Sequence, residues 1–123
     1  MGTDSRISGT LLCRAGEGRV AFAAHEVDSI ESPETFGGWA GSACEAFAEE
    51  SSSGRILVAA SGEAVGVNAL EIDAEPFVVL PAPAVLARVA GGSLRGFIQV
   101  RGMLWPVMSL VDFGRFLATG EAA

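Results

Sequence analysis

Short apolar runs that end in turn-forming residues limit the fold of this chain more than any other feature of its sequence. Residues 8–14 end in an apolar run, the Gly-containing segment 15–18 follows, and residues 20–23 are apolar again. Two such runs joined by a short loop with Gly are typical of a β-hairpin. We therefore expect the chain to begin with two antiparallel strands.

Two more hairpins are predicted further along the chain. The clearest is at residues 55–69, where two apolar runs flank the tight turn Ser61-Gly62-Glu63. The other is at residues 94–108, with Arg101-Gly102 as its turn. Residues 77–80 predict a further strand, because two prolines close that apolar run.

The stretch between the first and second hairpins is less regular. Val27 and Ile30 lie three residues apart, which predicts one helical turn over residues 25–30 with both side chains toward the core. Trp39 follows in a segment rich in Gly, and residues 43–50 can form a short helix before a run of serines.

Two short helices are predicted in the second half of the chain. Residues 84–90 can form one, with a proline near its start and two glycines after its end. Ser109 and Asp112 resemble a capping box with Asp in place of Glu, and the apolar residues of 110–117 then recur on one helical face. Residues 119–123 are expected to fray.

These elements predict a fold that is mainly β with short helices, and the regular spacing of the short strands indicates a small barrel-like architecture. The length of 123 residues allows one domain, which we place at residues 1–118. The longest uncharged apolar stretch, residues 77–87, is broken by prolines and is shorter than the about 20 apolar residues that a bilayer requires. Residues 1–7 do not resemble a secretory signal, so we expect a cytoplasmic protein.

The charge of the chain argues against nucleic acid as a partner. The net charge is −7, and the eight basic residues are scattered along the sequence. A nucleic-acid surface needs clustered cations that neutralise phosphates. We therefore expect no nucleic-acid binding and no membrane insertion, and the acidity serves solubility or attraction to a basic partner.

The sequence offers no convincing catalytic or metal site. His25 is the single histidine, and it has no Cys or carboxylate partner at ligand spacing. A Gly-x-Ser-x-Gly elbow is missing, and residues 91–96 lack the Gly-Lys-Ser/Thr ending of a phosphate loop. Cys13 is expected to be a small buried apolar residue and Cys44 an incidental thiol. We therefore expect a protein that is not an enzyme and that needs no cofactor or metal.

Two tryptophans and one proline are candidates for interaction sites. Trp105 lies inside a predicted strand, which favours packing in the core over a role at an interface. For Trp39 the two roles stay equally open, since Trp is also enriched at interfaces. Pro106 has no N–H to give to a sheet, so its strand is expected at an edge or a bulge, where another chain can dock.

Three groups of residues follow the order and spacing of one known family. They are residues 11–30 with Gly16 and the motif Val27-x-x-Ile30, residues 55–67 with Gly62 and Val65-Gly66-Val67, and residues 94–117 with Leu110-Val111-Asp112. In that order they resemble the opening, the central hairpin, and the closing hairpin and helix of CheW-like chemotaxis coupling proteins. The likeness covers most of the chain.

The resemblance implies a CheW-like pair of small β-barrels and a role as an adaptor in two-component signal transduction. One barrel of such a protein contacts a CheA-like histidine kinase, and a hydrophobic groove near the junction contacts the cytoplasmic tips of methyl-accepting chemoreceptors. Two parts of the family pattern are altered here. A stretch is missing between Pro33 and Arg55, and residues 68–72 replace a Val-Asp-x-Val strand.

The missing stretch belongs to the first barrel, so the resemblance implies that this barrel is reduced and that kinase coupling is weakened or lost. The short form resembles the reduced adaptors of gliding-motility (Frz-type) chemosensory systems. Residues 35–54 are too rich in Gly, Ala and Ser to replace a hairpin, although Trp39 and Phe47 can plug the gap. A partner is then expected to cover the exposed edge.

The resemblance also assigns candidate partner-binding residues. Val27 matches a receptor-contacting valine, Ser29 stands where the family often has an acidic contact residue, and Ile30 matches an apolar position. Trp39 joins them as a candidate from its own setting. The expected partners are a chemoreceptor tip, a CheA-like kinase or another CheW-like protein, and a second copy of this chain as a homodimer.

Two other functions stay open on the residues alone. A small β-barrel can hold a small ligand in an apolar pocket with a few convergent polar groups. An enzyme is the least supported reading, because catalysis requires convergent polar groups that the sequence does not display.

Overall fold

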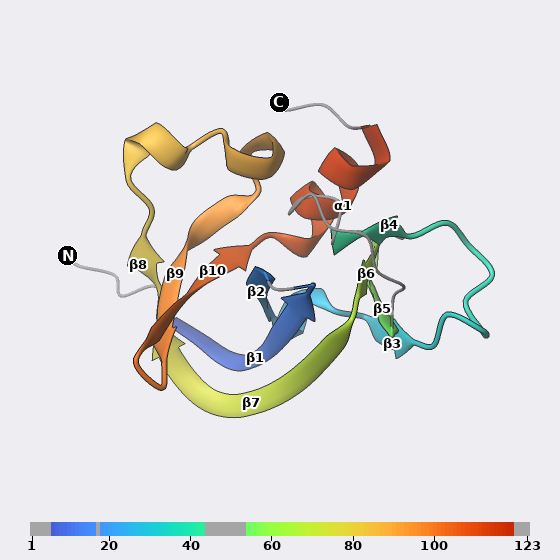
Figure 1. Cartoon of the computed structure of the whole chain (residues 1–123), viewed down its shortest axis with the longest axis horizontal. Coiled ribbons are helices and arrows are strands. Elements are labelled where there is room, and N and C mark those ends of the chain that lie inside the picture. Colours follow the sequence, from blue (N-terminus) through green and yellow to red (C-terminus); the bar gives the residue numbers. More distant parts are fainter. Residues whose placement is uncertain (1–5, 17, 44–53, 120–123) are drawn as a thin grey trace.

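Two β-sheets and a C-terminal helix make up the part of the chain that the structure, a computed structural model, describes (Figure 1). That part comprises residues 6–16, 18–43 and 54–119, with side chains from residue 9 onward. The strands are β1 (Arg6–Ala15), β2 (Gly18–Ala23), β3 (Ser29–Glu31), β4 (Gly41–Ser42), β5 (Arg55–Val58), β6 (Ala64–Val67), β7 (Ala69–Val78), β8 (Leu80–Pro81), β9 (Leu94–Val100) and β10 (Met103–Met108). The helical segments are the 3₁₀ turns η1 (Ala24–Glu26), η3 (Ala84–Leu86) and η4 (Val89–Gly92) and the α-helix α1 (Leu110–Thr119).

The larger sheet has six strands in the order β7-β1-β2-β10-β9-β8. The strands at its two edges, β7 and β8, belong to one extended segment, because Val79 alone separates them in the chain. The sheet therefore curls round, so that its two edge strands are consecutive in the sequence (Figure 1). That segment pairs with β1 along β7 and with β9 at Leu80 and Pro81. The curl encloses an apolar cluster made of Leu12, Ala21, Ile98, Val100, Trp105 and Val107.

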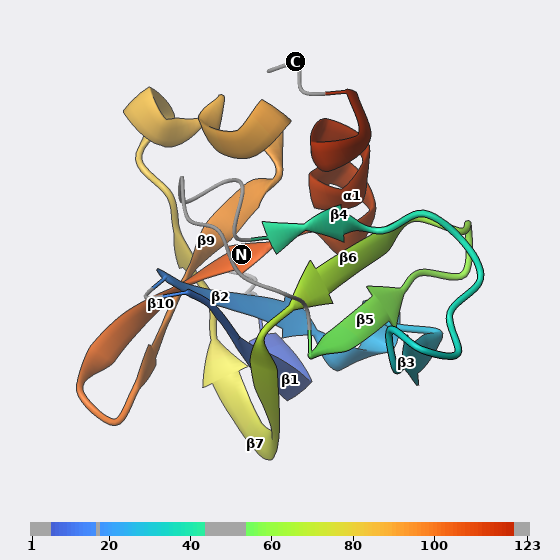
Figure 2. The same cartoon turned by 45° about the vertical axis from the view of Figure 1, so that its right-hand side comes forward.

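The smaller sheet has four strands in the order β3-β5-β6-β4 and lies on the opposite side of β1 and β2 from the β9–β10 hairpin (Figure 2). Its last strand has two residues, and Gly41 pairs in parallel with Val65. A Cβ on Gly41 would lie 2.5 Å from the Cβ of Leu117, so glycine is what lets β4 approach α1. Helix α1 therefore closes one side of this sheet.

Strands β1 and β2 form a wall between two apolar cores. Leu12 and Ala21 face the inside of the curled sheet. On the other face, Leu11, Cys13 and Phe22 join a second core with the small sheet and α1. Alternate residues of a strand face opposite sides, so a strand buried on both faces must be apolar throughout. This second core, called here the shared core, also holds Val20, Leu57, Val65, Val67, Met108, Leu110, Phe113 and Leu117.

Several predictions from the sequence are confirmed. The first hairpin forms between β1 and β2, the second between β5 and β6, and the third between β9 and β10 around Arg101-Gly102. The last helix begins where expected, and the Ser109 hydroxyl accepts a hydrogen bond from the Asp112 N–H at 3.2 Å. Trp105 is buried, and the fold is mainly β with short helices.

The helical turn expected over residues 25–30 is wrong. The 3₁₀ turn ends at Glu26, and Val27 is already extended, with φ −96° and ψ 115°. Ile30 lies in β3 and is 39% exposed, so it stands at the margin of the core and is not buried in it. A spacing of three apolar residues does not distinguish a turn from a strand, and pairing with β5 decides for the strand here.

The second half of the chain differs from expectation in three places. The second hairpin ends at Val67, and the long strand β7 begins at residue 69. Only residues 77–78 of β7 overlap the strand that was expected at 77–80. The helix expected at 84–90 is replaced by η3 and η4, and Ala90 inside η4 has a φ of 49°. Strand β10 is not an edge strand, but the expected bulge is present, because its register with β9 shifts between Val107 and Met108. β10 also pairs with β2 only through its last two residues, so Pro106 has no β2 neighbour to bond.

Some expectations fall outside the described residues. They concern Cys44, Phe47, most of the helix at 43–50, the serine run and residues 120–123. Thr119, which was expected to fray, is the last described residue of α1. Among the described residues, no helix has the length and the apolar character needed to cross a bilayer.

Glu63 links the β5–β6 turn to α1 and should make stability depend on acid pH. Its carboxylate accepts hydrogen bonds from the Ser61 hydroxyl and from Arg115 Nε at 3.2 Å. The Ser61 bond, assisted by Arg115 and opposed by burial, lowers the pKa of Glu63 below its ordinary 4.5. A carboxyl whose pKa is lower in the folded state stabilises the fold at pH values above its pKa in the unfolded chain. This stabilisation is lost as the pH falls through its pKa in the folded state.

We predict that Glu63→Gln lowers the free energy of unfolding near neutral pH and that the difference from the parent shrinks at an acid pH that protonates the Glu63 carboxyl in the folded state. Urea unfolding at the two pH values measures this. Arg88→Gln is the control, since it changes one charge away from this contact. A loss that is equal at both pH values would contradict the ionic role of Glu63.

Candidate functional site

The described side chains do not gather into a nucleophilic or metal site. Among them, no three His, Cys, Asp or Glu side chains lie close enough to hold a metal ion. Burial raises the pKa of the Cys13 thiol to about 12, which keeps it protonated and unreactive at neutral pH. Cys13 is thus the small buried apolar residue that its position in the sequence predicted.

The chain crosses from the small sheet to the curled sheet at Asn68, and this crossover is tightly held. The Asn68 N–H donates to the Arg14 carbonyl at 2.8 Å, and the Asn68 side-chain oxygen accepts from the Gly16 N–H. On the other side, the Gly54 N–H donates to the Val67 carbonyl at 2.7 Å. These bonds fix the two sheets relative to each other at one point.

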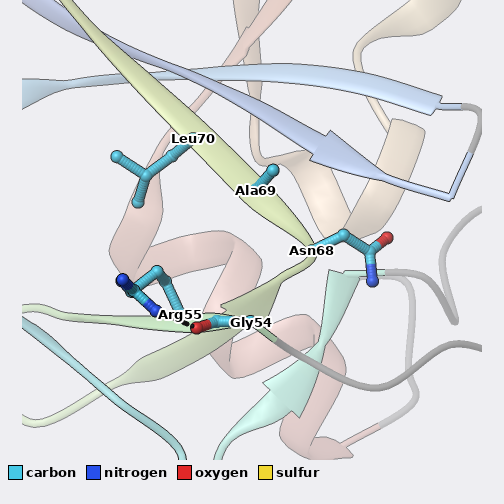
Figure 3. Close-up of a pocket in the computed structure, with 5 residues that line it drawn as sticks. All are labelled: Gly54, Arg55, Asn68, Ala69 and Leu70. Atoms are coloured by element: carbon cyan, nitrogen blue, oxygen red, sulfur yellow. Dashed lines mark hydrogen bonds between the residues drawn. The ribbon is translucent and has the colours of Figure 1, made fainter.

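An open hollow of about 400 Å³ lies at this crossover, lined by Gly54, Arg55, Asn68, Ala69 and Leu70. Figure 3 shows Arg55 and Leu70 projecting on one side of the crossover and the Asn68 amide on the other. The Arg55 guanidinium donates to the Gly54 carbonyl at 2.7 Å, which holds the charge beside the backbone. The hollow therefore combines one cation, one amide and one apolar side chain.

Apolar side chains reach the surface at the margins of the shared core, where the two sheets meet. Leu70 on β7 and Val27 after η1 are partly buried and pack against that core. Ile72 stands opposite Leu11, and Ile30 stands opposite Leu57. Directly opposite residues share a face of the sheet, so both isoleucines are on the core side of their strands. We call Val27, Ile30, Leu70 and Ile72 the junction surface.

Both strands that carry this surface are sheet edges. β7 is an edge strand of the curled sheet, and β3 is an edge strand of the small sheet. Ile72 is 63% exposed and Ile30 is 39% exposed, although both are large apolar residues. Exposed large apolar side chains on edge strands are candidate contacts for a partner protein.

Glu26 holds the segment before Val27 in place. Its carboxylate accepts a hydrogen bond from the Leu110 N–H at 2.7 Å, at the N-terminus of α1. A helix N-terminus has unpaired N–H groups and a partial positive charge, which a carboxylate stabilises. The position of Val27 is therefore coupled to α1 as well as to the shared core.

The residues expected to bind partners are only partly brought together. Val27 and Ile30 contribute to the junction surface, and Ser29, whose side chain points to the other face of β3, is half-buried. Trp39 is 62% exposed and lies two residues before β4, at the opposite edge of the small sheet from Ile30. Trp39 is therefore a surface residue that does not belong to the junction surface.

Leu70 and Ile72 were not expected from the sequence as site residues. A signal was present, because the apolar residues Leu70, Ile72 and Ala74 alternate with Glu71, Asp73 and Glu75. Alternation of apolar and acidic residues is the pattern of a strand with one face toward a core.

No protein-family model matches the chain, and no curated protein is significantly similar to it.

The crossover leaves no room for a side chain at Gly54, where a Cβ would lie 2.2 Å from the Asn68 carbonyl oxygen. We predict that Gly54→Ala lowers the free energy of unfolding by about 1–3 kcal/mol, because backbone must move to relieve the overlap. Gly37→Ala is the matched control, since nothing lies within 4 Å of its added Cβ. Chemical denaturation of both variants measures the effect, and equal stabilities would contradict a rigid crossover.

Proposed function

We propose that this chain is a non-enzymatic chemosensory adaptor, a shortened CheW-like protein that binds the cytoplasmic tip of a methyl-accepting chemoreceptor. The observation that carries the proposal is the junction surface, an exposed apolar margin where two small β-sheets share one core. A six-stranded curled sheet beside a four-stranded sheet is consistent with a pair of small barrels of which the first is reduced.

The chemistry of the junction surface fits a helical partner. Receptor tips of this kind are coiled coils, and a helix binds another protein by laying an apolar stripe against an apolar groove. Ile72 and Ile30 supply exposed apolar contacts, while Val27 and Leu70 are anchored in the shared core and stay in place. Assembly of receptor and adaptor is then the whole activity, and it takes place in the cytoplasm.

The reduced small sheet supports a second part of the proposal, which is weak coupling to a CheA-like kinase. β4 has two residues, and β3 has three. Strands this short offer little edge and little surface to a further domain. The edge at β3 is open to a second copy of the chain or to another CheW-like protein.

We predict that Ile72→Asp weakens receptor binding by about tenfold or more, which corresponds to about 1.4 kcal/mol, while the fold is kept. Ile72 is exposed in the free protein, so the charge costs little until a partner covers it. Val85→Asp is the matched control, because Val85 is 87% exposed and lies on η3. Titration of a soluble receptor tip, with circular dichroism for folding, measures both variants.

Equal binding by the Ile72 and Val85 variants would refute the junction surface as the receptor site. Val27→Asp is a different probe, since Val27 packs against the shared core, and it is expected to lower stability as well as binding.

We also predict that the kinase from the same system binds at least tenfold more weakly to this chain than to a full-length CheW-like protein. The expected reason is the short edge of the small sheet. Isothermal titration against the kinase, with light scattering to follow self-association, measures this. Tight binding of the kinase by a strict monomer would show that the shortened sheet keeps the full docking surface.

The hollow at Asn68 supports an alternative function, a small module that holds a small ligand. Its volume of about 400 Å³ falls within the range of ligand sites, and Arg55 places a cation in its lining. A thermal-shift screen against metabolites distinguishes the two functions, since a ligand that binds only the folded state raises the melting temperature.

A further inference from the structure

Two arginines that are scattered in the sequence meet at one mouth of the curled sheet. Arg14 on β1 and Arg19 on β2 are directly opposite residues of the first hairpin. Their guanidinium carbons lie 5.5 Å and 5.8 Å from the centre of the Trp105 ring. Trp105 is 5% exposed, so its ring fills the mouth and the two guanidinium groups cover it. We call Arg14, Arg19, Met103 and Trp105 the arginine rim.

The pairing of two like charges is unfavourable by itself. Like charges on directly opposite residues destabilise a sheet, whereas a cation over an aromatic face is attracted to it. The Trp105 ring thus compensates for the repulsion between Arg14 and Arg19. A guanidinium that stacks with its plane over a ring keeps its N–H groups at the edge, where they can bind a carboxylate.

No described carboxylate pairs with the two arginines of the rim. Arg101, at the turn of the β9–β10 hairpin, pairs with Glu71 at 3.3 Å. Among the described residues, no carboxylate lies within ion-pair distance of Arg14 or Arg19, and the polar contact recorded for Arg19 is with the Met103 sulfur at 3.9 Å. Met103 is 44% exposed and shares the face of Trp105.

We propose that the arginine rim is a docking site for an acidic segment of a second protein. One carboxylate bridges Arg14 and Arg19, and an apolar side chain beside it packs on Met103. Charge complementarity selects this partner, because the rim concentrates positive charge on a chain whose net charge is −7. The site goes beyond the receptor contact proposed above, since none of its residues belongs to the junction surface.

A nucleic acid is a poorer match to the same rim. Single strands bind by stacking bases on exposed aromatic rings, and Trp105 lies under the arginines. An oligonucleotide is therefore a competing outcome of the test.

The experiment uses the full chain carrying Trp39→Phe, so that Trp105 is the single tryptophan. The probe is a fluorescein-labelled peptide of four glutamates around one leucine, with a second peptide in which glutamines replace the glutamates. Anisotropy gives the dissociation constant, and Trp105 emission reports whether the peptide reaches the rim. Arg14→Gln, Arg19→Gln and Arg14→Lys are compared with Arg88→Gln, which removes an exposed charge elsewhere.

We expect saturable binding of the acidic peptide that changes Trp105 emission and weakens with added salt, since exposed charges are screened. Each glutamine variant of the rim should weaken binding of the acidic peptide about tenfold. Arg14→Lys should weaken it less, because lysine keeps the charge and loses the planar stack. Arg88→Gln should change it by less than about twofold. Thermal melts identify any variant that does not fold, and the remaining rim variants then carry the comparison.

Three results would overturn the proposal. They are the lack of saturable binding by the acidic peptide, equal binding of the glutamine peptide, and binding that the rim variants leave unchanged. Tighter binding of an oligothymidine of similar length would assign the rim to nucleic acid instead. None of these results bears on receptor binding, which is measured separately at the junction surface.

Discussion

The two-sided burial of β1 and β2 is the constraint on which the rest of the structure depends. Each strand alternates apolar side chains between the inside of the curled sheet and the shared core, so neither core can form without this wall. Phe22 illustrates the coupling, because it is fully buried and its ring centre lies 6.0 Å from that of Phe113 on α1. A hairpin near the start of the chain and the last helix are therefore stabilised together, although the sequence separates them widely.

The same wall determines where function can appear. Side chains at its centre are buried on both faces and have only a packing role, whereas its margins hold the residues that reach solvent. At one margin the wall meets β7 and η1, which gives the junction surface. At another, the β1–β2 turn opposes the β9–β10 hairpin and brings Arg14 and Arg19 over Trp105. Asn68 bonds to the wall at Arg14 and Gly16, and so fixes the small sheet to it.

Local sequence signals predicted the parts of the fold that depend on local chemistry. The three hairpins follow from apolar runs around Gly-containing turns, and α1 follows from Ser109 and the apolar spacing after it. Strand β7 was largely missed although its apolar and acidic residues alternate, and its pairing with β1 is non-local. Arg14 and Arg19 face each other within the first hairpin, but their shared contact with Trp105 also depends on non-local packing. Cross-strand neighbours are set by the pairing of strands, which spacing along the chain does not show.

The small sheet shows how a sheet of short strands can be covered from within the chain. An open sheet must leave its apolar face exposed or cover it with another element. Trp39, one of the two aromatic residues considered for that role, is mostly exposed and does not plug a gap. Helix α1 covers the face instead, since Leu117 approaches Gly41 and Arg115 bonds Glu63. The apolar face is thus satisfied within the chain, and β3 is left as an edge strand. A partner of the small sheet is therefore expected to add at the edge that carries Ile30, next to the junction surface, and not to replace a missing core.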